Sequence, residues 1–175
     1  AKRHFEQLLQ AYPDSPEVVY PVAILALQQN DKALAETQLK HLLTLKVQDK
    51  NPAHYYLGQL AEDGRRTEEA LDQYTQVLSG EHYLPAQMRR ARLLAEQGKM
   101  EQARAVLRNA KTEKEEERVQ MSIAEAGLLR EANRPQEAFD LLDSLLAEQP
   151  EQPDLIYETA LLAERLGRLE LMETR

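Results

Sequence analysis

Residues 51–84 read NPAHYYLGQLAEDGRRTEEALDQYTQVLSGEHYL, and this stretch decides the fold. Large and very small residues alternate through two helix-length runs, which a Gly-Arg-Arg break at residues 64–66 separates. Small residues such as Gly58, Ala61 and Ala70 let two paired helices approach closely, because little side chain stands between their backbones. The stretch therefore predicts a helical hairpin.

The same pattern recurs along the whole chain. Repeats start at residues 16, 51, 84, 119 and 153, which gives a period of about 33 to 35 residues. Position eight is always small, and position ten is always leucine: Ala23, Gly58, Ala91, Ala126 and Ala160, followed by Leu25, Leu60, Leu93, Leu128 and Leu162. We therefore expect one array, with residues 1–15 as the second helix of a preceding repeat, repeats at 16–50, 51–83, 84–118 and 119–152, and a partial repeat at 153–175.

Residues that end helices and form turns lie where this division into repeats requires them. Turns inside the repeats are expected at 30–31, 64–65, 98–99, 133–134 and 167–168, where Asn or Gly tolerates the left-handed conformation that ends a helix. Pro21 lies well inside a predicted helix and should bend it or delay its start. The charge run TEKEEER at 112–118 is read as a solvated link whose acidic residues favour the next helix start, with docking of a basic partner as the alternative.

The amino-acid composition and net charge exclude several classes of function. With 42% hydrophobic and 30% charged residues the chain can bury a core, while 5% aromatic residues favours closely packed Leu and Ala. A net charge of -8 argues against nucleic acid and anionic membrane surfaces as partners. No apolar run approaches a membrane span, and the absence of cysteine excludes thiol chemistry here while fitting cytoplasm or periplasm equally.

Signatures of enzymes are missing. There is no Gly-rich phosphate loop, no G-x-S-x-G and no H-E-x-x-H, and no pair of histidines has metal-ligand spacing. Glu81-His82 is the one pair with metal or proton-transfer chemistry, and ordinary loop polarity is the simpler interpretation. We expect no catalytic residue, no metal and no cofactor.

The spacing resembles the tetratricopeptide repeat, a unit of 34 residues with small residues at fixed positions. This resemblance implies an all-α, right-handed superhelical solenoid of helical hairpins that binds partner peptides or helices on its concave face. It places these residues on that face: Tyr20, Ile24, Leu27, Tyr55, Gln59, Met88, Arg92, Ile123, Arg130, Tyr157 and Leu161. The alternative for each is packing against the neighbouring repeat.

Five arginines make the third repeat basic: Arg89, Arg90, Arg92, Arg104 and Arg108. Arg90 and Glu125 occupy position seven, which is normally leucine in the family. Ion pairs between adjacent helices, such as Arg90 with an acidic residue of the preceding repeat, are one interpretation. Capture of an acidic segment is the other.

A narrower resemblance rests on GEHYLPAQMRRARLLAEQG at 80–98 and the closing ALLAERLGRLELME. These phrases are similar to large proteobacterial tetratricopeptide lipoproteins of the outer membrane, which present cell-wall hydrolases to a periplasmic C-terminal processing protease. The resemblance implies a non-catalytic adaptor in the periplasm, tethered by a lipid outside this sequence; a cytoplasmic location is the alternative. Neither end supplies the polar cap that a solenoid needs, so we expect a piece of a longer protein. Self-association of the array, or an interaction domain of a larger multidomain protein, is the competing function.

Overall fold

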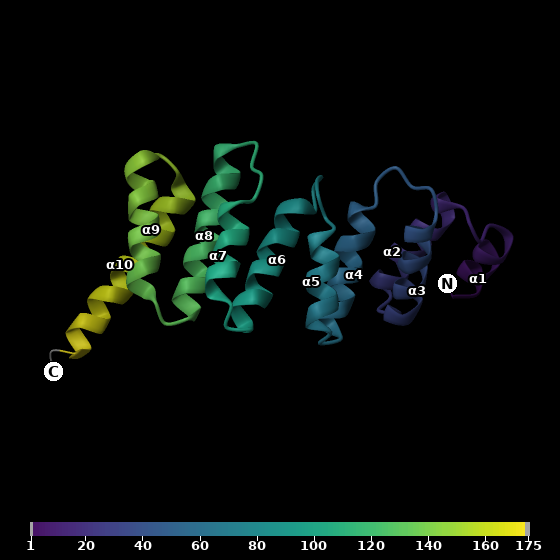
Figure 1. The fold of residues 1–175 in the computed structure, drawn as a ribbon, viewed down its shortest axis with the longest axis horizontal. Helices are drawn as coiled ribbons and strands as arrows, with labels where there is room; N and C mark the ends of the chain where they lie inside the picture. Colours follow the sequence, from purple (N-terminus) through teal and green to yellow (C-terminus); the bar gives the residue numbers. More distant parts are fainter. Residues whose placement is uncertain (1, 174–175) are drawn as a thin grey trace. The chain divides into compact units, whose positions relative to one another are not determined.

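The structure, a computed structural model, describes the backbone of residues 2–173 and the side chains of residues 7–167. Every regular element in this part of the chain is a helix, as predicted (Figure 1). The helices are α1 (Lys2–Ala11), α2 (Pro16–Gln28), α3 (Lys32–Thr44), α4 (Asn51–Asp63), α5 (Thr67–Thr75), α6 (Tyr83–Glu96), α7 (Met100–Arg108), α8 (Glu115–Glu131), α9 (Pro135–Glu148) and α10 (Pro153–Glu173). The chain divides into two compact units, residues 1–86 and 87–175, and each is described by itself.

In the first unit, consecutive helices pack as hairpins. Helix α2 packs on α3, and α4 packs on α5. Helix α3 also contacts α4, so the first of these hairpins packs against the second. The core lies along one face of each helix, at spacings of three and four residues that suit the helical period. Its buried members are Val19, Ala23, Ala26, Ala35, Leu39, Leu42, Ala53, Leu57 and Leu60.

Helices α4 and α5 approach each other closely at Gly58, where the sequence predicts a small residue. A Cβ atom there would lie 2.5 Å from Cε1 and 2.6 Å from Cδ1 of Tyr74, far inside normal contact. Tyr74 is fully buried, and its hydroxyl donates to Oε2 of Glu62 at 2.6 Å. Glycine at position 58 therefore gives the tyrosine ring of the paired helix its place.

Four turns share one geometry. Each has a left-handed residue followed by an N–H that reaches back five residues, which satisfies a carbonyl at the helix end. The left-handed residues are Asn30 (φ 59), Arg65 (φ 57), Gly98 (φ 76) and Asn133 (φ 59). The turn at 64–65 forms where predicted, but Gly64 has φ -81 and Arg65 carries the unusual conformation instead.

In the second unit, α7 packs on α8, α8 on α9, and α9 on α10 (Figure 1). Its buried core again follows the helical period, at positions three, four or seven apart: Val119, Ala126, Leu129, Ala138, Leu142, Leu155 and Leu162. Helix α8 begins at Glu115, four residues before the predicted repeat start, with three glutamates in its first turn. Oε2 of Glu117 accepts hydrogen bonds from the N–H groups of Glu113 and Lys114, so the charge run does begin the helix.

Two expectations about helix boundaries are corrected. Helix α2 begins at Pro16 and continues through Pro21, so the proline does not delay its start. The predicted turn at 167–168 is wrong, because α10 runs without interruption from Pro153 to Glu173. Glycine inside a helix costs only about 1 kcal/mol relative to alanine, so Gly167 can continue the helix as well as end it.

Candidate functional site

In the first unit, the predicted binding residues lie on α2 and α4 and are half-buried. Tyr20 and Leu27 pack against the core of this unit. Gln59 donates from Nε2 to the hydroxyl of Tyr55 at 3.3 Å, one turn earlier on the same helix. Ile24 is half-buried as well. The residues predicted for the concave face are called the stripe from here on, and its members in the first unit are neither fully buried nor fully exposed.

Tyr55 belongs to an aromatic cluster that sequence reasoning missed. The ring of His82 stacks on Tyr55 with centroids 4.6 Å apart and an interplanar angle of 11°, and it meets Tyr56 edge-on at 5.3 Å. The side chain of His82 is only 16% exposed. His82 therefore acts as a packing residue that joins the loop after α5 to α4. No group of three or more potential ligands is arranged to hold a metal ion among the residues described.

In the second unit, the predicted residues are more exposed. Met88 is 40% exposed and Tyr157 is 63% exposed, which makes them the most exposed large hydrophobic side chains among the predicted binding residues. Leu161 is 38% exposed, and the Arg92 side chain is 47% exposed with Nε 4.0 Å from Glu96. Ile123 and Arg130 are half-buried: Ile123 packs on the core, and Arg130 lies 4.0 Å from Oε2 of Glu158. The binding role of the stripe stays a prediction.

A buried carboxylate fixes α8 to α7. Glu125 is 2% exposed, and its Oε1 accepts from Nε of Arg104 at 2.7 Å and from Nη2 of Arg108 at 2.6 Å. Nε of Arg108 also donates to Oε2 at 3.1 Å. A buried charge is tolerated only when it is paired and hydrogen-bonded, and two guanidinium groups meet that condition here.

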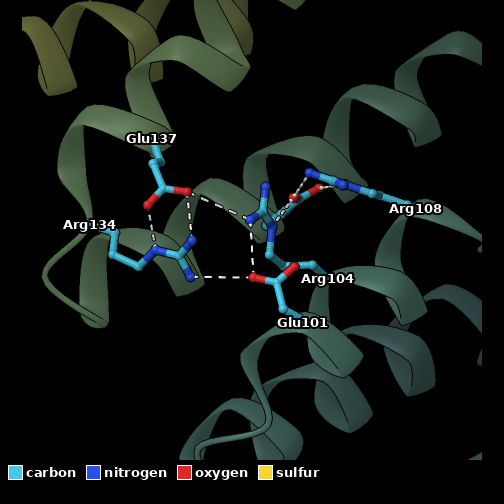
Figure 2. Close-up of polar contacts among 6 residues, drawn as sticks. Glu101, Arg104, Arg108, Arg134 and Glu137 are labelled. Atoms are coloured by element: carbon cyan, nitrogen blue, oxygen red, sulfur yellow. Dashed lines mark hydrogen bonds and ion pairs between the residues drawn. The ribbon is translucent and has the colours of Figure 1, made fainter.

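The Arg104 guanidinium lies within a wider network (Figure 2). Its Nη1 is 3.4 Å from Oε1 of Glu101 and 3.7 Å from Oε2 of Glu137. Arg134 joins the same two carboxylates, at 3.5 Å from Glu101 and 2.6 Å from Glu137. Two of the five arginines of the third repeat are thus engaged by the helices that follow, which favours internal pairing over capture of an acidic segment for Arg104 and Arg108. The pairing predicted for Arg90 stays a prediction.

A second ion cluster, in the first unit, surrounds Glu36 of α3. Arg66 binds this carboxylate with both terminal nitrogens, at 2.7 and 2.9 Å, and Nζ of Lys40 donates at 2.7 Å. Hydrogen bonds from Arg66 and then from Lys40 lower the pKa of Glu36 to about 2. Because Arg66 immediately precedes α5, this cluster ties one hairpin to the turn of the next.

A family model, described as the tetratricopeptide repeat, matches residues 23–82 and 55–117. The chain belongs to the tetratricopeptide repeat family. Members of this family generally serve as protein-interaction modules and not as catalysts, and the all-α hairpin fold predicted from the sequence is confirmed.

One relative is the TPR repeat-containing protein PA4667 of Pseudomonas aeruginosa, which is 35% identical over 121 residues. That match covers 69% of this chain and 20% of the relative, so the chain spans about a fifth of the relative's length.

Solved structures share the fold at low identity. YrrB, described as a tetratricopeptide protein with an unusual peptide-binding site, is 15% identical with a TM-score of 0.61, over 87% of this chain and 78% of that one. PilF of Pseudomonas aeruginosa is 18% identical with a TM-score of 0.61, over 90% of this chain and 72% of that one.

In the described part of the chain, no helix is both long enough and apolar enough to cross a membrane.

Proposed function

We propose that this chain is a non-catalytic adaptor that binds segments of partner proteins through the stripe of first-helix residues and holds these partners near one another. The observation that carries the proposal is the exposure of large side chains along that stripe in the second unit, with Tyr157 at 63% and Met88 at 40%. Aromatic, methionine and arginine side chains are the types that protein interfaces favour. The mechanism is a raised effective concentration of one partner beside another.

The partners that we propose are cell-wall hydrolases and a periplasmic C-terminal processing protease. Support comes from the resemblance of residues 80–98 and of the last helix to outer-membrane adaptor lipoproteins, and from a bacterial relative that is 35% identical. We accordingly propose a periplasmic location, with the lipid anchor outside this sequence. YrrB supplies a precedent for peptide binding on the same fold.

The test is a pull-down from a proteobacterial envelope extract, read by mass spectrometry. The native chain is compared with a variant that carries Met88→Ala, Arg92→Glu and Tyr157→Ala, three exposed positions of the stripe. The control is Leu78→Ala, which removes a 68% exposed leucine outside the stripe. We expect a processing protease or a cell-wall hydrolase with the native chain and the control, and its loss with the triple variant.

Two results contradict the proposal. If neither class of enzyme is retained by the native chain, the assigned partners are wrong. If the triple variant retains them as well as the control does, binding uses another face, and the stripe is not the site.

A second candidate function is self-association, and the exposed apolar face of α10 favours it. Ile156, Tyr157 and Leu161 expose 46%, 63% and 38% of their surface within two turns. Large exposed apolar patches mark interaction sites. Light scattering over a wide concentration range separates the two functions, because an adaptor stays monomeric and a self-assembling module gains mass.

A further inference from the structure

A cavity of about 270 Å³ opens in the first unit beside Tyr20, one of the predicted binding residues. Its walls come from the first turns of α2 and α4, from the end of α3 and from the loop that joins α3 to α4. The lining residues are Pro16, Glu17, Tyr20, Leu42, Val47, Asp49, Pro52 and Ala53. A segment that crosses the start of α2 would therefore meet this cavity.

The cavity suits an aliphatic side chain. Its floor is apolar, since Leu42 and Ala53 are buried core residues and Val47 packs against the same core. A cavity of roughly 150 Å³ is enough for a benzene-sized group in an apolar interior. The volume beside Tyr20 thus admits a leucine, isoleucine or valine side chain together with some of its backbone.

Two of the residues that line the cavity, Glu17 and Asp49, are exposed carboxylates. Asp49 uses Oδ1 to accept hydrogen bonds from the backbone N–H of Asn51 at 2.9 Å and from its amide at 2.6 Å, which holds the side chain at the start of α4. The nearby Lys50 donates from Nζ to the carbonyl of Leu43 at 2.8 Å.

The hydroxyl of Tyr20 reports the same acidic surroundings. Its pKa is raised by burial first, and then by the neighbouring Tyr56 and by the negative charges of Glu81 and Asp49. Three carboxylates therefore act on one apolar hollow: Glu17 and Asp49 line it, and Glu81 acts on its tyrosine. A cation beside the aliphatic side chain would gain from this field, and an anion would be repelled.

We propose that this cavity docks an aliphatic side chain of a partner segment that carries lysine or arginine directly beside it. The inference rests on the proposed function as a protein-binding module and names the chemistry of one partner segment. The apolar floor supplies affinity for the aliphatic group, and the carboxylates select basic neighbours over acidic ones. Segments in which acidic residues flank the same aliphatic side chain are excluded by charge.

The test uses three synthetic heptapeptides, blocked at both ends, and the 15N-labelled protein observed by NMR. The first peptide is Gly-Ser-Lys-Leu-Lys-Ser-Gly; the second has serine in place of both lysines, and the third has alanine in place of leucine. We expect the first to shift the amide signals of Val47 and Ala53 with the highest affinity. The second should bind about three- to tenfold more weakly at low salt, in keeping with two exposed charge pairs. The third should lose most of the shift.

A charge-neutralising variant carries Glu17→Gln and Asp49→Asn. The asparagine keeps an oxygen acceptor for Asn51, so the start of α4 is preserved while both charges are removed. The control is Asp72→Asn, an exposed carboxylate of α5 that does not line the cavity. The double variant should weaken the Lys-Leu-Lys peptide about three- to tenfold and leave the serine peptide unchanged, while the control should change neither.

The outcomes separate this inference from the proposed function. Equal affinity of the lysine and serine peptides, or no shift at Val47 and Ala53 with any peptide, overturns the cavity proposal even if the pull-down retains the expected partners. Shifts at Val47 and Ala53 in the expected order support the cavity proposal, and a pull-down that retains neither enzyme class then rejects the assigned partners alone.

Discussion

Replacing Gly58 with alanine should destabilise the first unit, although alanine is the better helix former. The new Cβ would lie 2.5 Å from a ring carbon of Tyr74, which is fully buried and held by Glu62. Overpacking of this kind costs about 1 to 3 kcal/mol, and such a short contact with a fixed ring belongs at the upper end. The gain in helix propensity returns about 1 kcal/mol, so we expect a net loss of about 2 kcal/mol.

The matched control is Gly127→Ala in the second unit. Gly127 also lies inside a first helix, and a Cβ there would meet nothing within 4 Å, so alanine should stabilise by about 1 kcal/mol. The two identical substitutions should therefore differ by about 3 kcal/mol in free energy of unfolding.

Urea unfolding followed by circular dichroism measures this difference. Because repeat arrays can unfold in parts, hydrogen exchange of the α4 and α5 amides should locate the loss. The double variant Gly58→Ala with Tyr74→Leu should regain part of the lost free energy of unfolding, because the ring that clashes with the new Cβ is gone. Equal stabilisation by both glycine substitutions would refute the argument, because it would mean that Tyr74 moves aside freely.

Three further predictions follow from the polar contacts. Glu125→Gln should cost about 3 kcal/mol in urea unfolding, because Arg104, which is 14% exposed, loses its buried anion; the exposed Glu137→Gln is the control and should change little. The pKa of Glu36 falls from 4.5 to about 2 on folding, so the stability it adds is full above pH 4.5 and is lost as the pH falls toward 2. Solvent screening limits this loss to about 1 kcal/mol, and Glu36→Gln should abolish that part of the acid dependence. Tyr74→Phe should lower the thermal midpoint, since the bond to Glu62 at 2.6 Å contributes about 1.5 kcal/mol.

The sequence predicted the hairpins because their cause is local and repeated. Small residues at position eight mark where two helices must come close, and Gly58 against Tyr74 shows that contact directly. The turn positions followed from residues that accept a left-handed backbone, and Asn30, Gly98 and Asn133 adopt it. Four of the five predicted turns are therefore found at the predicted places.

Three features escaped prediction. Arg65, and not Gly64, takes the left-handed conformation. The turn is closed by a hydrogen bond from the N–H of Arg66 to the carbonyl of Ala61, five residues earlier. His82 looked like an ordinary loop residue, and only the fold brings it onto Tyr55. Gly167 carried a turn signal in a stretch that continues as a helix.

The candidate site was predictable in part. The resemblance to the tetratricopeptide repeat placed the stripe on first helices, but it did not separate exposed members such as Tyr157 from those that pack inward, such as Ile123. For Glu125 a usable signal did exist: an acidic residue stood at position seven, which is normally leucine in the family, and two arginines four residues apart preceded it. That combination predicts an internal ion pair more readily than an open binding surface.

The buried carboxylate of Glu125 also limits how this array can change by duplication or exchange of repeats. An apolar surface between two hairpins can be replaced by another apolar surface of similar shape with modest loss of stability. The α7 to α8 junction is different, because Glu125 needs the arginines of the preceding helix, Arg104 and Arg108, and any other neighbour would leave a charge without its partner. A repeat inserted at this point, by evolution or by a protein engineer, must bring both halves of the ion pair with it, so the third and fourth repeats are expected to be inherited together.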